Sequence, residues 1–231
     1  MLCSVRERLS RIHPESGRPA TEYILLALAL FSLGLVAVRI THTGELTYLF
    51  MPWNLFLAFV PYGLSSRLAS RPWMGRGRWL MAGVFLLWLL FLPNSFYLLT
   101  DLFHLRARPG VPLWYDLALL LSFAWTGLLL GLLSLRQMQR ILEIFFGTGT
   151  GKWMPVAVLV LNGLGIYIGR YLRYNSWDVI KNPVGLAGDM AHLLFHPVRN
   201  TGAWAMILCY GLLLNLLFLS VERLSRSFQS S

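Results

Sequence analysis

The chain has 231 residues, of which 56% are hydrophobic and only 13% are charged, and its mean hydropathy is +0.59. These values exclude a soluble globular enzyme and indicate an integral membrane protein whose first partner is the lipid bilayer. The net charge of +10 does not call for nucleic acid as a partner, because basic loop residues beside anionic lipid account for it.

Six long apolar runs alternate with polar stretches along the chain. A helix needs about 20 mostly apolar residues to cross the hydrocarbon core. In the second run, Pro52 and Pro61 predict a kink or a partly re-entrant segment. We predict an all-α membrane bundle of about six transmembrane helices with no soluble domain. It occupies residues 23–221, between a basic N-terminal segment at 1–22 and a tail at 222–231. The runs lie at residues 23–38, 46–64, 79–99, 114–135, 153–172 and 201–221.

The basic residues predict the orientation of this bundle. With six spans, 13 of the 20 lysines and arginines fall on the side of the two termini, and seven fall on the other side. Cytoplasmic loops carry the excess of positive charge, so both termini are predicted to be cytoplasmic. The outer side then receives all four aspartates and four of the five histidines, namely Asp101, Asp116, Asp178, Asp189, His42, His104, His192 and His196. We therefore expect a functional site at the outer face.

The outer end of the third run carries one polar stripe. If the run stays helical, Asp101 and His104 are three residues apart and share a face with Asn94 and Tyr97. Asp101 and His104 could ligate a divalent metal, or act as a base with the residue that orients it. We predict both as catalytic residues and as metal ligands, and Asn94 and Tyr97 as substrate-binding residues.

Two further segments bring charge to the same side. Asp116 starts the fourth run, and a second group ends the fifth. Guanidinium groups bind phosphates and other anionic headgroups. We predict Asn175 and Asp178 as catalytic residues. The predicted substrate-binding residues of these segments are Asp116, Arg170, Arg173 and Trp177.

Each of these residues also has a structural interpretation. A carboxylate at Asp116 favours a helix N-terminus, and the two arginines, Arg170 and Arg173, favour a helix C-terminus. Together with Asp101 and Asp178 they could form an ion-pair network in place of a substrate site. The sequence leaves the two interpretations open.

A short amphipathic stretch at residues 185–196 places Asp189, His192 and His196 on one face. Two histidines four residues apart resemble half of a zinc site, but a metal needs three or more ligands. We favour a helix lying in the membrane interface. Within the spans, Asn54, Asn162 and Asn215 are each expected to form a hydrogen bond between helices. The pairs Gly127 with Gly131 and Gly165 with Gly169 are expected to allow close helix packing.

The strings PNSFYLLTDLFHL, WYD and GRYLRYNSWD together resemble the domain-of-unknown-function family numbered 1361, of bacterial multi-spanning membrane proteins. The resemblance runs from the second span to the sixth, and residues 189–196 are not part of the family's pattern. It implies a multi-pass protein of the bacterial inner membrane. The family carries no established activity, so the resemblance implies no substrate.

Three classes of function fit these features. The first is a membrane-embedded hydrolase or transferase that acts on a lipid or lipid-linked substrate with an anionic group. The second is a transporter of ions or small solutes. Prolines within spans support this class, whereas a polar cluster far from the midplane argues against it. The third is an accessory subunit whose ion pairs form a docking surface for a protein partner. We prefer the enzyme, because polar groups gathered in one place are the default hypothesis for a site.

Overall fold

The computed structural model describes residues 18–70 and 78–227. Most of the predicted N-terminal segment and the end of the predicted tail lie outside these residues, as do Arg71 and Arg76, two of the 13 basic residues predicted to be cytoplasmic. The chain divides into two compact units, Met1–Gly151 and Lys152–Ser231. Each unit is described by itself.

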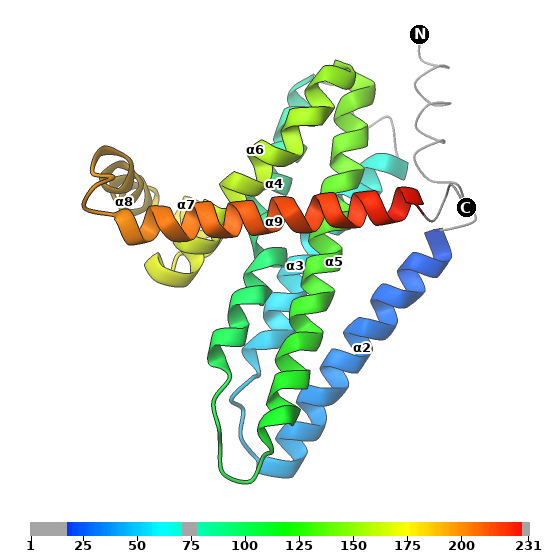
Figure 1. Cartoon of the computed structure of the whole chain (residues 1–231), viewed down its shortest axis with the longest axis vertical. Coiled ribbons are helices and arrows are strands. Elements are labelled where there is room, and N and C mark those ends of the chain that lie inside the picture. The colour runs from blue at the N-terminus through cyan, green and yellow to red at the C-terminus, as the bar shows by residue number, and fades with distance from the viewer. Residues whose placement is uncertain (1–17, 71–77, 228–231) are drawn as a thin grey trace. The chain divides into compact units, whose positions relative to one another are not determined.

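The described part of the first unit is an antiparallel arrangement of long helices. Helix α2 (Arg18–Thr43) leads through residues 44–49 to α3 (Phe50–Ser70). Helix α4 (Arg78–Thr100) continues into the 3-10 turn η2 (Asp101–His104), and after residues 105–112 helix α5 (Leu113–Phe146) packs along α3 and α4 (Figure 1). Helix α2 also packs against α5, so α5 is the central helix of this unit.

The predicted all-α membrane fold is confirmed. Five helices among the described residues are long and apolar enough to cross a membrane. The predicted second span is a helix, α3, but it is not among the five. The five candidates are Ala20–Thr43, Trp79–His104, Leu113–Phe146, Trp153–Leu172 and Thr201–Ser225.

Helix α5 is longer than the apolar run that predicted it. The run ends at residue 135, whereas the helix of 34 residues continues to Phe146. At this length it measures about 50 Å, more than the roughly 30 Å of a hydrocarbon core. Its polar extension stays helical because Met138, Ile141 and Leu142 continue the buried stripe at helical spacing.

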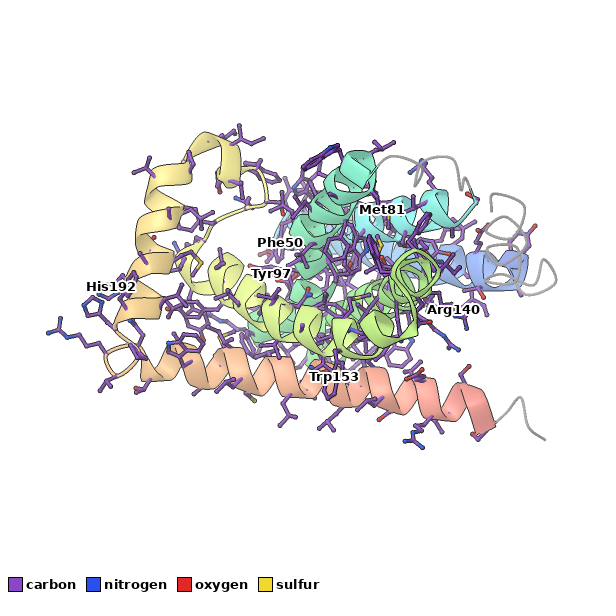
Figure 2. All side chains as sticks on the ribbon, turned by 90° about the horizontal axis from the view of Figure 1, so that it is seen from above. Phe50, Met81, Tyr97, Arg140, Trp153 and His192 are labelled. Carbon is purple, nitrogen blue, oxygen red and sulfur yellow. The ribbon has the colours of Figure 1, made fainter. Side chains whose placement is uncertain are left out.

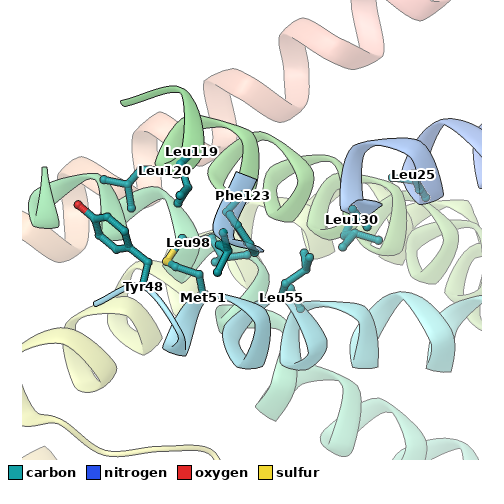
Figure 3. Close-up of a cluster of buried hydrophobic side chains, with 12 residues drawn as sticks. Leu25, Tyr48, Met51, Leu55, Leu98, Leu119, Leu120, Phe123 and Leu130 are labelled. Carbon is teal, nitrogen blue, oxygen red and sulfur yellow. The ribbon is translucent and has the colours of Figure 1, made fainter. Parts of the chain in front are cut away.

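The hydrophobic core of the first unit lies between α3, α4 and α5 and reaches α2. Figure 3 shows the cluster with Tyr48 at one end and Leu25 of α2 at the other. The hydroxyl group of Tyr48 points away from the cluster, toward the polar residues described below. The buried members are Leu25, Ala29, Val36, Tyr48, Met51, Leu55, Ala58, Leu98, Leu119, Leu120, Phe123 and Leu130.

Two glycines let α5 approach α4 closely, as their spacing predicts. A Cβ atom on Gly127 would lie 2.5 Å from both the Cδ1 atom of Leu98 and the backbone oxygen of Ser95. A Cβ atom on Gly131 would meet the ring of Phe96 at 2.7 Å. Small residues at these positions allow van der Waals contact between backbones, which drives helix association in lipid.

The same three helices share a buried polar network. The hydroxyl of Ser65 on α3 donates to the side-chain oxygen of Gln137 at 2.7 Å and lies 3.1 Å from the hydroxyl of Ser134 on α5. The indole N–H of Trp88 on α4 donates to Ser134 at 2.7 Å. Such bonds fix one register between helices, because a slipped register would leave these groups unpaired in an apolar core.

The second unit contains most of α6 (Thr148–Tyr167), the π-helical turn η3 (Ile168–Leu172), α7 (Asp178–Lys181), α8 (Pro183–Phe195) and α9 (Thr201–Ser227). A short turn joins α8 to α9 (Figure 2). Leu193, Ala203 and Ile207 form their shared core, and the indole N–H of Trp204 donates to the backbone oxygen of Leu193.

Candidate functional site

The polar side chains of the first unit gather where α2 ends and α5 begins. This end contains the C-terminal turn of α2, residues 44–49, η2, residues 105–112 and the first turn of α5, and it lies at the bottom of Figure 1. We call it the loop end. Helices that run antiparallel bring these sequence-distant segments to one place.

Asp101 is buried at the loop end. Its carboxylate accepts a hydrogen bond of 3.1 Å from the side-chain amide of Asn54 on α3, and its other oxygen lies 3.8 Å from Nδ1 of His104. The side chain of His104 is 40% exposed, whereas that of Asp101 is 1% exposed. The structure therefore brings together two of the four residues predicted as catalytic, with the carboxylate inside and the imidazole reaching the surface.

A change of helix type positions this pair. At Thr100, α4 tightens into the 3-10 turn η2, and the hydroxyl of Thr100 donates to the backbone oxygen of Tyr97 at 2.7 Å. Side chains at positions i and i+3 of a 3-10 helix eclipse each other. Asp101 and His104 consequently share one side, and Nδ1 of His104 also lies 3.3 Å from the backbone oxygen of Asp101.

Asp116 has a partner that the sequence analysis did not propose. Its Oδ1 accepts a hydrogen bond of 2.8 Å from Nε of Arg39, and its Oδ2 lies 3.4 Å from Nη2 of the same guanidinium. The hydroxyl of Tyr48 donates to Oδ2 at 3.2 Å. Asp116 does lie in the first turn of α5, as the helix N-terminus interpretation requires.

Tyr48 links Asp116 to the backbone of η2. Its hydroxyl lies 3.4 Å from the backbone oxygen of His104 as well as close to Asp116. Its ring contacts two cations, with the guanidinium carbons of Arg39 and Arg108 at 4.8 Å and 5.1 Å from the centroid. Burial, with the negative charge of Asp116, raises the pKa of Tyr48, so its phenol stays a hydrogen-bond donor at neutral pH.

Arg39, Tyr48 and Arg108 were not predicted as site residues. The signal that could have found Arg39 is a guanidinium inside the last turn of a span, where an unpaired charge is costly. Nothing in the sequence indicates which carboxylate it meets. The expected bond between helices is confirmed for Asn54 by its contact with Asp101. The side-chain amides of Asn162 and Asn215 instead donate to backbone oxygens one turn earlier in their own helices.

Asn94 and Tyr97 lie on α4 before Asp101 and His104, and both are half-buried. The side-chain amide of Asn94 donates to the backbone oxygen of Phe91 at 2.9 Å, within its own helix. The assignment of Asn94 and Tyr97 to substrate binding stays a prediction.

The remaining predicted residues belong to the second unit. Arg170 lies in the π-helical turn η3, and Arg173 follows it in the left-handed backbone region with φ of 60°. Asp178, which follows Trp177 at the start of α7, accepts a hydrogen bond of 2.6 Å from the backbone N–H of Asn175. The Asp178 carboxylate thus closes a local turn with the backbone of Asn175.

Residues 185–196 form a helix, as predicted, and α8 extends from Pro183 to Phe195. Asp189 accepts a hydrogen bond of 2.9 Å from the hydroxyl of Tyr174, and this bond raises the pKa of Tyr174. The rings of His192 and His196 stack at 4.8 Å, and His192 lies on the exposed face of α8 (Figure 2). Asp189 therefore turns to a tyrosine and not to the histidines.

Metal binding at the predicted pair would need additional ligands. Asp101 and His104 offer one carboxylate and one imidazole, whereas protein metal sites commonly use three or more donors. Across residues 18–70 and 78–227, no group of three or more histidine, cysteine, aspartate or glutamate side chains could hold a metal ion. The divalent metal stays a prediction that calls for direct measurement.

Comparisons with known proteins identify a family but no activity. A family model described as "Protein of unknown function (DUF1361)" matches residues 53–217, well over half of the chain. No curated protein and no solved structure matches the chain significantly. The matched segment includes Asn54, Asp101, His104 and Asp116 but begins after Arg39 and Tyr48.

Proposed function

We infer the function from the geometry of the loop end. The chain belongs to the DUF1361 family, and the description of that family assigns no activity. The chain is a membrane protein with several apolar helices of spanning length. We propose that it is a membrane-embedded hydrolase or transferase of the bacterial inner membrane, with cytoplasmic termini and the loop end at the outer face. Its substrate is a lipid or lipid-linked molecule with an anionic group.

The single observation that carries this proposal is the pairing of a buried carboxylate with a partly exposed imidazole. Asp101 is held by Asn54, which limits its movement, and it lies 3.8 Å from Nδ1 of His104. This distance exceeds a hydrogen bond, but catalytic contacts are often long without substrate and shorten when substrate binds. A carboxylate in this position orients the imidazole and stabilises its protonated form.

The pair supports general acid–base chemistry. His104 accepts the proton of a water or hydroxyl group while that oxygen attacks an ester carbon or a phosphorus atom. The imidazolium then returns the proton to the leaving oxygen as the bond to it breaks. The Asp101 carboxylate stabilises the imidazolium while it carries the proton. The reaction is a displacement at carbon or phosphorus and therefore needs no oxidant or reductant.

The position of the pair supports a lipid substrate. His104 ends a candidate span, Trp79–His104, and its ring packs against Phe50 with centroids 5.1 Å apart. Phe103 is 55% exposed and Trp114 is 67% exposed near the same loops. Exposed aromatic rings at a span end are typical of the membrane interface, where headgroups and ester bonds lie.

The test is turnover of defined lipids by the full-length protein. Vesicles of phosphatidylethanolamine, phosphatidylglycerol and cardiolipin receive wild type, Asp101→Asn or His104→Gln, and mass spectrometry follows the loss and gain of lipid species. His42→Gln is the matched control, because His42 is an exposed histidine at the end of α2. We expect turnover by wild type and the control, and its loss in the other two variants. A fully active Asp101→Asn protein with native helix content contradicts the proposal.

The accessory subunit is the second candidate, and the burial of the Arg39–Asp116 pair favours it. Both side chains are almost fully buried, which is what a rigid scaffold would require. In that case Asp101→Asn would leave all lipid species unchanged relative to wild type, while a stoichiometric protein partner would copurify.

The Arg170 and Arg173 side chains are tested separately for anion binding, by substitution of each with glutamine in the same vesicles.

A further inference from the structure

Two guanidinium groups at the loop end contact the ring of Tyr48. One belongs to Arg39, which is 2% exposed and pairs with Asp116, itself 1% exposed. The other belongs to Arg108, which is half-buried. Among the described residues, no ion pair joins Arg108 to a carboxylate.

Both guanidinium groups also retain a buried N–H group without a hydrogen bond. Nη1 of Arg39 and Nε of Arg108 are shielded from solvent and have no acceptor among the described residues. Buried donors in proteins are almost always paired with protein, water or a bound group. Two such donors on arginines that contact the same ring indicate an acceptor that binds from outside the protein.

Glu45 marks where that acceptor would bind. Its carboxylate lies 3.9 Å from Nη1 of Arg39, too far for a hydrogen bond, and its side chain is 60% exposed. An exposed carboxylate at this distance compensates the charge weakly and can move aside. An anion with several oxygens would satisfy the donors that Glu45 does not.

We propose that Arg39 and Arg108 form a binding site for one phosphate group, beside the ring of Tyr48. Arginine donors suit phosphate because its oxygens accept several charge-assisted hydrogen bonds at once. Asp116 does not repel this anion strongly, since its charge is already neutralised by Arg39. The site goes beyond the proposed reaction, because binding at these arginines requires no turnover at His104.

The phosphate could be a lipid headgroup or a free ion, and the experiment separates these sources. The full-length protein in neutral detergent is titrated with inorganic phosphate by calorimetry. In a parallel arm, native mass spectrometry measures the retention of added phosphatidic acid against phosphatidylcholine. Binding of phosphatidic acid alone identifies a lipid headgroup, and binding of both identifies a phosphate site open to solvent. Binding of neither overturns the proposal.

Three variants make the test specific. Arg108→Gln removes one donor while keeping the Arg39–Asp116 pair, and we expect phosphate affinity to fall about ten-fold or more. Arg106→Gln is the matched control, because it removes the same charge from an exposed position of the same loop. Glu45→Gln removes the competing carboxylate, so it should tighten binding. Equal affinities for Arg108→Gln and Arg106→Gln would show only general charge attraction and would overturn the site.

Discussion

Arg39 and Asp116 are 77 positions apart in sequence, and their side chains meet at 2.8 Å with at most 2% of either exposed. The pair ties the end of α2 to the start of α5. Removing one partner of a buried ion pair leaves an uncompensated charge, whereas replacing both with apolar residues is often tolerated.

Separate and joint replacement of this pair should therefore differ. We expect Arg39→Met or Asp116→Leu alone to lower the free energy of unfolding by about 3 kcal/mol or more. The double variant should lose much less than the sum of the two single losses. Detergent-induced unfolding followed by circular dichroism measures all four proteins. Additive losses would mean that the two side chains do not interact in the folded protein.

The contact between Asn54 and Asp101 predicts a result for exchanged residues. Asn54→Asp places two carboxylates within hydrogen-bond distance of each other, and we expect it to lower stability by about 2 kcal/mol. Adding Asp101→Asn restores one carboxylate and one amide, so the exchanged protein should regain part of this loss. Thermal unfolding of the three proteins checks the prediction. If the exchanged protein is less stable than Asn54→Asp, the contact does not form as described.

The glycines of α5 predict where added bulk is harmful. Gly127→Ala places a methyl group 2.5 Å from Leu98 and from the backbone of Ser95, so α4 and α5 must separate. We expect a loss of about 1–3 kcal/mol, the usual range for overpacking. Gly83→Ala on α4 is the control, because its methyl group meets nothing within 4 Å and alanine favours helix. Equal melting temperatures for the two variants would contradict close packing at Gly127.

Tyr48 predicts a change of stability in alkaline solution. Burial and the charge of Asp116 raise its pKa in the folded protein above the unfolded value of about 10. Its contribution to stability is therefore complete below about pH 10 and is lost as the pH rises through the folded pKa. Tyr48→Phe keeps the ring but cannot ionise, so its stability should fall less above about pH 10. Thermal unfolding across this window would show parallel curves if Tyr48 were solvated.

Metal content is the simplest test of the predicted ligands Asp101 and His104. If Asp101 and His104 ligate a divalent metal, elemental mass spectrometry should find close to one equivalent in the purified protein, with further donors completing the coordination. Asp101→Ala and His104→Ala should then lose it. A wild-type protein that carries no metal would contradict the predicted ligands.

Local features of the sequence predicted much of the fold and one part of the site. Apolar runs predict helices because a backbone in lipid must satisfy its hydrogen bonds internally. Asp101 and His104 were correctly placed together because they are three residues apart in one continuous segment, and either helix type puts such residues on one side. Gly127 and Gly131 were recognised for the same reason, since their spacing alone defines a smooth helix face.

Contacts between distant segments depended on the tertiary structure. The sequence places Arg39, Tyr48, Asp116 and Arg108 in four separate segments, and no local rule selects the partner of each. Only the packing of α2 and α3 against α5 decides that Asp116 meets Arg39 and Tyr48. The hydropathy of a segment depends only on its own composition, so the sequence of each segment is enough to predict a helix. Ion pairs depend on the register between helices, which the packed core determines.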